Sequence, residues 1–316
     1  MKAALIAVLV PLIAAFHSAP ASAQTMPVFL FEWGGFGTAS GQFRYPYGCA
    51  VGPDGSVIVT DQYNFRVKVF GPAGDLVRSW GSQGTQPGQF GTQIGVATDA
   101  QGRVYVADYG NRRVQVFSTT GSFLRVFAVG ISAVDVTLGP DGNAYVVGAP
   151  LPGPYHGHVY VYDQAGVLLR QFGDLEIPRG VTFAPDGTLW APDGETRSLV
   201  QFDPNTGVQL QSKRMGNVDP SFVSIGGICI LDSGVICVCD FDGGKVLMLM
   251  PSLDLIGTFG VLGNGPGELA SAVDIAPSYD GGFYVVDLKG SKVSRFGAAA
   301  TAIRTASWGS VKATYR

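Results

Sequence analysis

The chain is poor in the residues that most often carry metal and redox chemistry. Its 316 residues include only four cysteines and three histidines. Neither a Cys-x-x-Cys pair nor the Cys/His spacing of a zinc site occurs, which excludes the common structural zinc motifs. Charged residues make up only 14% of the chain, and lysine and arginine form no cluster. We therefore expect no nucleic-acid partner.

Long apolar runs and helical periodicity are also scarce beyond the N-terminus. There, Lys2 precedes the apolar run Ala3–Phe16 and the small-residue stretch Ala21–Ala23, the pattern of a secretory signal peptide. The run is too short to span a bilayer, and Pro11 interrupts it. We predict a signal peptide at residues 1–23 and a domain at 24–316, exported to the periplasm or secreted, without membrane insertion.

The chain is rich in glycine, with 45 residues, and some of these glycines recur at fixed spacing in a repeat. Three landmarks recur with a first step of seven residues and a second step of six. They are Gly48/Gly55/Asp61, Gly95/Gly102/Asp108, Asp135/Gly142/Gly148, Gly180/Gly187/Asp193, Gly227/Gly234/Asp240 and Asp274/Gly281/Asp287. Each repeat holds four short β-type segments separated by turn residues. The pattern predicts an all-β, six-bladed β-propeller of four-stranded antiparallel blades, which is one domain.

The expected blades follow from these landmarks. They run over Pro46–Gly81, Gly91–Val129, Ser132–Gly173, Pro178–Arg214, Ser224–Gly260 and Ala272 to Gly297 or Gly309.

The second repeat carries a family resemblance. Its segments Gly95–Ala97, Gly102–Asp108, Asn111–Val114 and Val116–Phe117 resemble the NHL repeat. The resemblance covers about residues 29 to 309 and implies the propeller fold, but a propeller hosts many unrelated functions.

Two segments compete to close the ring. Phe29–Trp33 and Ile303–Gly309 both look like the fourth strand of a blade. In NHL propellers an N-terminal strand of this kind joins the last blade, so we favour Phe29–Trp33, paired with Lys292–Phe296. The C-terminal segment remains the alternative.

The repeated aspartates are interpreted as scaffold. Most precede a basic residue by five positions, which predicts pairs such as Asp61–Arg66, Asp108–Arg113 and Asp287–Lys292; in the fourth blade Arg197 follows Asp193 by four. Such ion pairs would hold the second and third strands in register.

Four cysteines remain to be placed. Cys49 lies in the first blade and Cys229, Cys237 and Cys239 in the fifth, where Cys229 is expected directly opposite Cys237. The sequence leaves open whether this pair is bonded or whether the thiols are simply buried.

The third blade departs from the pattern. Gly148 replaces the aspartate, and the following loop is five residues longer than in the first blade and contains Tyr155, His156 and His158. Prolines stiffen this loop, which would lower the entropy lost on binding. Two histidines are an incomplete metal shell, so a divalent cofactor stays open.

Four polar residues are expected beside that loop, at the mouth of the central channel. Asp135 and Asp274 stand where other blades have glycine, in blades opposite each other across the ring, and Tyr47 and Arg179 precede such glycines. Alternatively, aspartate simply tolerates the turn conformation as glycine does, and the long loop is a tolerated insertion.

These observations favour a non-catalytic, monomeric binding module for a protein, peptide or glycan, because no nucleophile, base and orienting residue can be assembled. The alternative is a metal-dependent propeller enzyme, lyase-like or lactonase-like. Lyase relatives hold zinc with histidines from several blades, whereas His156 and His158 share one loop. Lactonase relatives hold calcium with channel carboxylates, of which Asp135 and Asp274 supply two.

Overall fold

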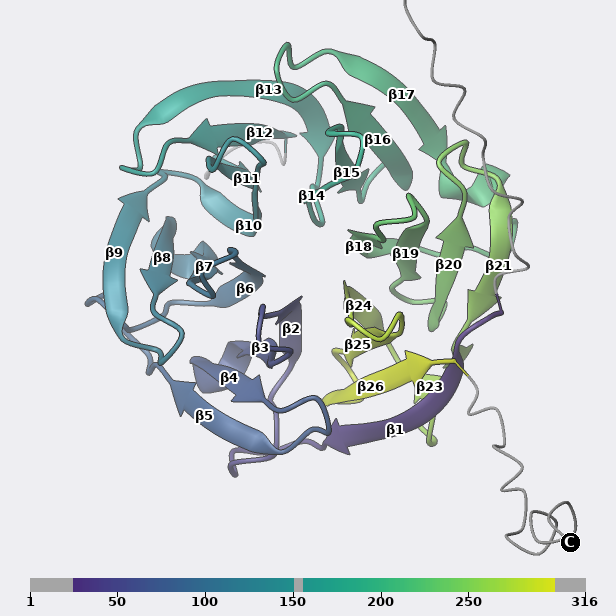
Figure 1. The fold of residues 1–316 in the computed structure, drawn as a ribbon, viewed down its shortest axis with the longest axis horizontal. Coiled ribbons are helices and arrows are strands. Elements are labelled where there is room, and N and C mark those ends of the chain that lie inside the picture. Colours follow the sequence, from purple (N-terminus) through teal and green to yellow (C-terminus); the bar gives the residue numbers. More distant parts are fainter. Residues whose placement is uncertain (1–24, 151–155, 299–316) are drawn as a thin grey trace, which may run out of the picture.

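Six four-stranded antiparallel sheets form a ring in the computed structural model, which describes residues 25–150 and 156–298 (Figure 1). The sheets follow one another around the ring as blades 1 to 6. This confirms the predicted all-β, six-bladed propeller. No helix of the described residues is long and apolar enough to cross a membrane.

Each blade uses consecutive strands from the inside outward, except that the outer strand of blade 6 comes from the N-terminal end of the described chain. Blade 1 contains β2 (Pro46–Val51), β3 (Val57–Asp61), β4 (Arg66–Phe70) and β5 (Leu76–Trp80). Blade 2 contains β6 (Gln93–Thr98), β7 (Val104–Asp108), β8 (Arg113–Phe117) and β9 (Phe123–Ala128). Blade 3 contains β10 (Ser132–Leu138), β11 (Ala144–Ala149), β12 (His156–Tyr162) and β13 (Leu168–Glu176).

The second half of the ring repeats this order. Blade 4 contains β14 (Thr182–Phe183), β15 (Leu189–Asp193), β16 (Ser198–Phe202) and β17 (Gln209–Arg214). Blade 5 contains β18 (Ile225–Ile230), β19 (Ile236–Asp240), β20 (Lys245–Leu249) and β21 (Leu255–Phe259). Blade 6 contains β24 (Ala272–Pro277), β25 (Phe283–Asp287), β26 (Lys292–Gly297) and β1 (Val28–Gly34).

The remaining described elements are short. Three single turns of 3₁₀ helix are η1 (Gln62–Asn64), η2 (Tyr109–Asn111) and η3 (Met215–Asn217). A two-residue parallel pair joins β22 (Val261–Leu262) to β23 (Glu268–Leu269).

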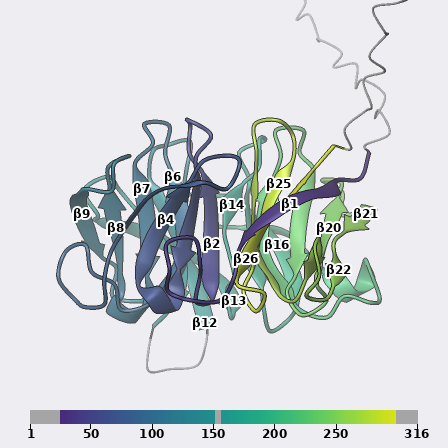
Figure 2. The same ribbon diagram turned by 90° about the horizontal axis from the view of Figure 1, so that it is seen from below.

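The turns between strands gather on two opposite faces of the ring (Figure 2). We call the face that carries the first-to-second-strand turns the hairpin face. There, Gly55, Gly142 and Gly187 have φ of 81°, 75° and 85°, a conformation that favours glycine. The other face carries the inter-blade linkers and the second-to-third-strand turns, and we call it the linker face.

The N-terminal strand closes the ring. Strand β1 pairs antiparallel with β26, with Phe29 opposite Phe296 and Trp33 opposite Val293, as predicted. Figure 1 shows the two strands side by side although they come from opposite ends of the sequence. Lys292 also donates to Glu32 at 2.9 Å across this junction. The competing segment Ile303–Gly309 lies outside the described residues.

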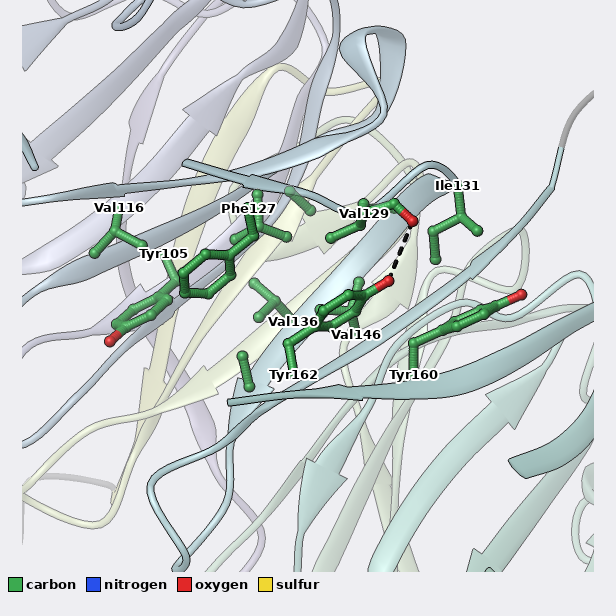
Figure 3. Close-up of a cluster of buried hydrophobic side chains, with 13 residues drawn as sticks. Tyr105, Val116, Phe127, Val129, Ile131, Val136, Val146, Tyr160 and Tyr162 are labelled. Atoms are coloured by element: carbon green, nitrogen blue, oxygen red, sulfur yellow. Dashed lines mark hydrogen bonds between the residues drawn. The ribbon is translucent and has the colours of Figure 1, made fainter. Parts of the chain in front are cut away.

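The core fills the spaces between neighbouring blades. Between blades 2 and 3, Tyr105 and Phe127 pack with Val136 and Val146, and the Tyr162 hydroxyl donates to the Val129 carbonyl at 3.1 Å (Figure 3). Burial of these side chains supplies the main stabilisation. Among the three tyrosines of this cluster, the Tyr162 hydroxyl is satisfied by the backbone and the Tyr105 hydroxyl by Asp99 and Arg125.

The repeated aspartates act as scaffold, but mainly by binding backbone. In five blades a carboxylate accepts the N–H of the residue 17 positions earlier, in the linker before the inner strand. These pairs are Arg44–Asp61, Gly91–Asp108, Glu176–Asp193, Val223–Asp240 and Ala270–Asp287. We call the five aspartates of these pairs the linker aspartates, because each one fixes the linker before its blade to the end of the second strand of that blade.

Several predicted ion-pair partners are wrong. Asp108 does bind Arg113 at 2.8 Å, but Asp61 binds Lys68 at 3.0 Å, while Arg66 donates to the Thr38 carbonyl. Lys292 pairs with Glu32 instead of Asp287. In blade 1 the error has a geometric cause, because side chains two apart on a strand share a face, so Arg66 and Lys68 compete for Asp61.

Candidate functional site

A cavity of about 270 Å³ opens on the linker face between blades 1 to 4. It is lined by residues of the inner strands, of the η2 turn and of the linker into β14. Among them are Tyr47, Ile94, Tyr109, Val134, Ile177 and Arg179. Two of the predicted site residues, Tyr47 and Arg179, therefore lie in one cavity.

Tyr47 and Arg179 occupy equivalent positions in opposite blades. Each follows a proline and precedes the glycine that starts the repeat, Gly48 or Gly180. Burial raises the pKa of Tyr47; the neighbouring Arg179 guanidinium opposes this shift, and the Asp274 and Asp135 carboxylates add to it. One tyrosine, one arginine and two carboxylates thus influence one another electrostatically.

Arg179 has unused hydrogen-bonding capacity. Its Nε is buried without a hydrogen-bond partner, and no ion pair among the described residues includes it. A guanidinium without a carboxylate partner is suited to an anionic or carbonyl group of a ligand.

Asp135 and Asp274 are held in matching ways by their neighbouring blades. Each lies at a β-bulge of its inner strand, β10 or β24, and a bulge redirects a side chain out of the regular alternation. Asp135 accepts the Val181 N–H at 3.0 Å, and Asp274 accepts the Cys49 N–H at 2.8 Å. Each carboxylate therefore connects its blade to the inner strand of the next.

The glycine of the preceding blade makes room for each carboxylate. A Cβ on Gly95 would collide with the Asp135 carboxylate, and a Cβ on Gly227 would collide with that of Asp274. The same arrangement therefore appears twice, in opposite halves of the ring.

We call Asp135 and Asp274 the channel pair. Burial raises the pKa of Asp135 well above its usual range, and the negative charge of Asp274 raises it further. Burial also raises the pKa of Asp274, to about 7, although N–H donors from Cys49 and Ile275 oppose the shift. Both side chains keep part of their surface exposed. Burial and the neighbouring carboxylate both favour the protonated form, since two nearby carboxylates resist being charged together.

The channel pair does not complete a metal site. No group of three or more His, Cys, Asp or Glu side chains among the described residues is placed to hold a metal ion. Zinc needs three or four protein ligands and calcium six to eight oxygens. The described His, Cys, Asp and Glu side chains therefore do not by themselves supply either ligand shell.

The histidines of blade 3 do not line the cavity. His156 lies 3.6 Å from the exposed Asp174 carboxylate, and His158 Nδ1 contacts the Gly173 carbonyl. Both therefore interact with the outer strand of their own blade, and neither belongs to the cavity lining. Tyr155 lies outside the described residues.

The four cysteines are buried and unbonded. Cys229 lies opposite Cys237 in the register of β18 and β19, as expected. Burial raises the pKa of the Cys49, Cys229 and Cys239 thiols, and the Asp274 charge adds to each shift.

The sequence reasoning missed several cavity residues. Ile94 precedes Gly95 just as Tyr47 precedes Gly48, so the same rule could have identified it. Tyr109 and Ile177 come from the η2 turn and a linker, and no spacing rule in the repeat indicates that such residues turn toward the channel.

Comparisons with known proteins agree with this fold. The NHL repeat model matches residues 43–70 and 94–117. Among solved structures, a streptogramin B lyase has 14% identity and a TM-score of 0.61, covering 85% of this chain and 97% of its own. A gluconolactonase from Xanthomonas campestris has 19% identity and a TM-score of 0.63, and the match covers 81% of this chain and 87% of the gluconolactonase.

A luciferin-regenerating enzyme has 13% identity and a TM-score of 0.66, and the match covers 87% of this chain and 96% of that enzyme. No curated protein matches the sequence. At such low identities these likenesses establish the propeller fold alone.

Proposed function

We propose that this chain, a six-bladed β-propeller with NHL repeats in its first two blades, is a non-catalytic binding module for a protein, peptide or glycan. The cavity on the linker face receives one anionic group of the ligand. The observation that carries this proposal is Arg179, which lines the cavity and forms no ion pair among the described residues.

The size of the cavity supports a ligand that inserts one residue. Its volume of about 270 Å³ is below the roughly 300–1,000 Å³ typical of pockets that enclose a whole small molecule. One acidic amino-acid side chain or one acidic sugar would fit, with the rest of the ligand lying on the linker face.

The proposal is tested with matched pairs of small probes in a thermal-shift assay. N-acetylglutamate and galacturonate carry a carboxylate, whereas N-acetylglutamine and galactose are their neutral counterparts. Binding raises the melting temperature by mass action, corresponding to about 2.7 kcal/mol at a hundredfold excess over Kd. We expect the acidic members to bind and Arg179→Met to abolish their effect.

Equal shifts for acidic and neutral probes, or unchanged shifts in Arg179→Met, would contradict this role for the cavity. Arg112→Met is the control, because Arg112 lies in a second-to-third-strand turn on the same face but is not part of the cavity lining.

A propeller enzyme remains the second candidate, and the channel pair is the observation that favours it. Carboxylates with raised pKa values near a cavity are often general acids or bases. The gluconolactonase and the lyases among the similar structures suggest lactone opening and related substrates as the first assays. Turnover that is lost in Asp135→Asn and Asp274→Asn would replace the binding proposal with this one.

A further inference from the structure

Three aromatic rings form an exposed cluster on the linker face of blade 1. Phe36, Tyr45 and Tyr63 are 63%, 41% and 52% exposed. The Phe36 and Tyr45 rings meet edge to face with centroids 6.2 Å apart, and Tyr45 and Tyr63 do so at 5.3 Å. Three large apolar side chains gathered in this way are unusual on a soluble protein, whose exposed aromatics normally stand alone.

Blade 2 shows that the fold does not require these rings. A shift of 47 residues superposes the two linkers, since the bridge Phe36–Phe43 recurs as Gln83–Phe90. The side chain of Asn64 donates to Gly37, as that of Asn111 donates to Gly84. At the equivalent positions blade 2 has Gln83 for Phe36, Thr92 for Tyr45 and Gly110 for Tyr63.

The cluster is also held in place by its backbone. Tyr45 has φ of 53°, a left-handed conformation that non-glycine residues seldom adopt. The Arg44 N–H on one side donates to the buried Asp61 carboxylate at 2.7 Å, and the Arg44 carbonyl accepts the Tyr63 N–H at 3.1 Å. Rings fixed in advance lose less entropy when a ligand covers them.

Arg44 adds a positive charge at the edge of the cluster. Its guanidinium carbon lies 5.9 Å from the centre of the Phe36 ring, and the side chain is exposed. A cationic ligand is therefore disfavoured, and a ligand with both flat apolar faces and negative charge is favoured.

We propose that Phe36, Tyr45, Tyr63 and Arg44 form a stacking subsite for an acidic oligosaccharide that continues toward the cavity at Tyr47 and Arg179. The C–H faces of sugar rings complement the negative faces of aromatic rings. A uronic acid also carries one carboxylate on every ring, which pairs with Arg44. Only Pro46 separates Tyr45 from the cavity residue Tyr47. The continuation into the cavity rests on the proposed binding function, whereas the stacking subsite does not.

Other extended ligands fit these features less well. A single-stranded oligonucleotide stacks on aromatic rings but needs a basic groove along its backbone, and lysine and arginine form no cluster in this chain. A proline-rich peptide would use the rings but not the arginine.

The test uses isothermal titration of the whole mature protein with α-1,4-linked trigalacturonate as the probe. Its fully methyl-esterified form keeps the sugar faces but loses the charge. We expect binding of trigalacturonate and at least roughly tenfold weaker binding of the ester. The variant Phe36→Gln/Tyr45→Asn/Tyr63→Ala should weaken binding by roughly tenfold or more, because stacking on several rings is lost. Asparagine is chosen for Tyr45 because it tolerates a positive φ.

Tyr279→Ala is the matched control, since Tyr279 is 73% exposed but lies in a turn on the hairpin face; it should bind like the wild type. Phe36→Gln and Tyr63→Ala alone provide the same comparison if the triple variant does not fold. Absence of trigalacturonate binding overturns the proposal. The proposal is also overturned if a proline-rich decapeptide binds through the three rings while trigalacturonate does not bind.

The two proposals can fail separately. Binding lost in Arg179→Met but unchanged in the triple variant would place the sugar in the cavity alone and overturn the stacking subsite. Binding lost in the triple variant but unchanged in Arg179→Met would support the stacking subsite and contradict the proposed function of the cavity.

Discussion

The linker aspartates and the channel pair use the same side chain for opposite purposes. In blade 2, Asp108 is fully buried and accepts hydrogen bonds from Gly91, Asn111 and Arg113, so its charge is compensated on all sides. Asp135 accepts the backbone N–H of Val181, and the negative charge of another carboxylate, Asp274, raises its pKa further. The difference shows that a carboxylate recurring in the repeat has its charge compensated by the scaffold, whereas the two that replace a repeat glycine lie beside another carboxylate.

The largest expected effect is at Asp108. Replacing it with alanine removes an ion pair and leaves the Gly91 N–H and the Arg113 side chain without their partner. We expect a loss of about 3–5 kcal/mol in the free energy of unfolding, as when one member of a buried pair is removed. Urea unfolding followed by tryptophan fluorescence measures it, and a loss below about 1 kcal/mol would contradict the scaffold role.

A smaller effect is expected at Lys68, which is buried against Asp61 at 3.0 Å. Blade 2 has Gln115 at the equivalent position, and its amide reaches Asp108 at 3.2 Å. Lys68→Met should therefore cost about 3 kcal/mol, because it leaves Asp61 uncompensated. Lys68→Gln should cost only about 1 kcal/mol, because it restores a hydrogen bond. The same urea titration compares them, and equal losses would show that charge and hydrogen bonding at Asp61 are irrelevant.

The channel pair should have the opposite dependence on pH from an ordinary ion-paired carboxylate. Its pKa values are raised in the folded state, so the folded chain binds more protons than the unfolded chain above about pH 4. Stability from the pair is therefore complete below pH 4 and is lost as the pH rises through about 7.

Asp274→Asn removes the part of this loss that comes from Asp274 and from its charge acting on Asp135. Relative to the wild type, we expect the variant to gain about 1–2 kcal/mol between pH 4 and pH 8. Unfolding free energies of both proteins at several pH values test this, with Asp186→Asn on an exposed hairpin turn as the control. A difference that does not change with pH would show that the two carboxylates titrate independently of burial.

The smallest expected effect concerns Cys49. Burial raises the pKa of its thiol, and the Asp274 charge adds to the shift. Because only the thiolate reacts, Asp274→Asn should increase alkylation of Cys49 by iodoacetamide at pH 8 by about two- to threefold. Peptide mass spectrometry measures the rate, with urea-unfolded protein as the reference. An unchanged rate would mean that burial alone controls this thiol.

Much of the fold could be predicted because each blade repeats the same local chemistry. The turn at Gly55 and the buried Asp61 each have counterparts at fixed spacing, so errors in one blade are corrected by the others. Phe29–Trp33 and Ile303–Gly309 both resembled a fourth strand, and Phe29–Trp33 was favoured because an N-terminal strand closes the ring in NHL propellers. The ion-pair partner of Asp61 could not be predicted, because Arg66 and Lys68 share a strand face and only packing decides between them.

The candidate site was predictable only in part. Tyr47 and Arg179 were found because they stand beside repeat landmarks, and they do share a cavity. His156 and His158 were chosen because their loop is unusual, yet they contact Asp174 and Gly173 on the outer strand of their own blade. An insertion indicates where a chain tolerates change, not where its side chains point.

The junction between β1 and β26 has a consequence for how this protein is made. Glu32 and Lys292 meet although 260 residues separate them in sequence, so β1, which is synthesised early, has no partner until β26 has been made near the end of synthesis. Contacts of such separation slow folding, because a long loop must be closed before they form. Until then β1 offers unpaired backbone to other chains. The last step of folding is therefore also the step most exposed to aggregation, and dilute conditions should favour the yield of refolding.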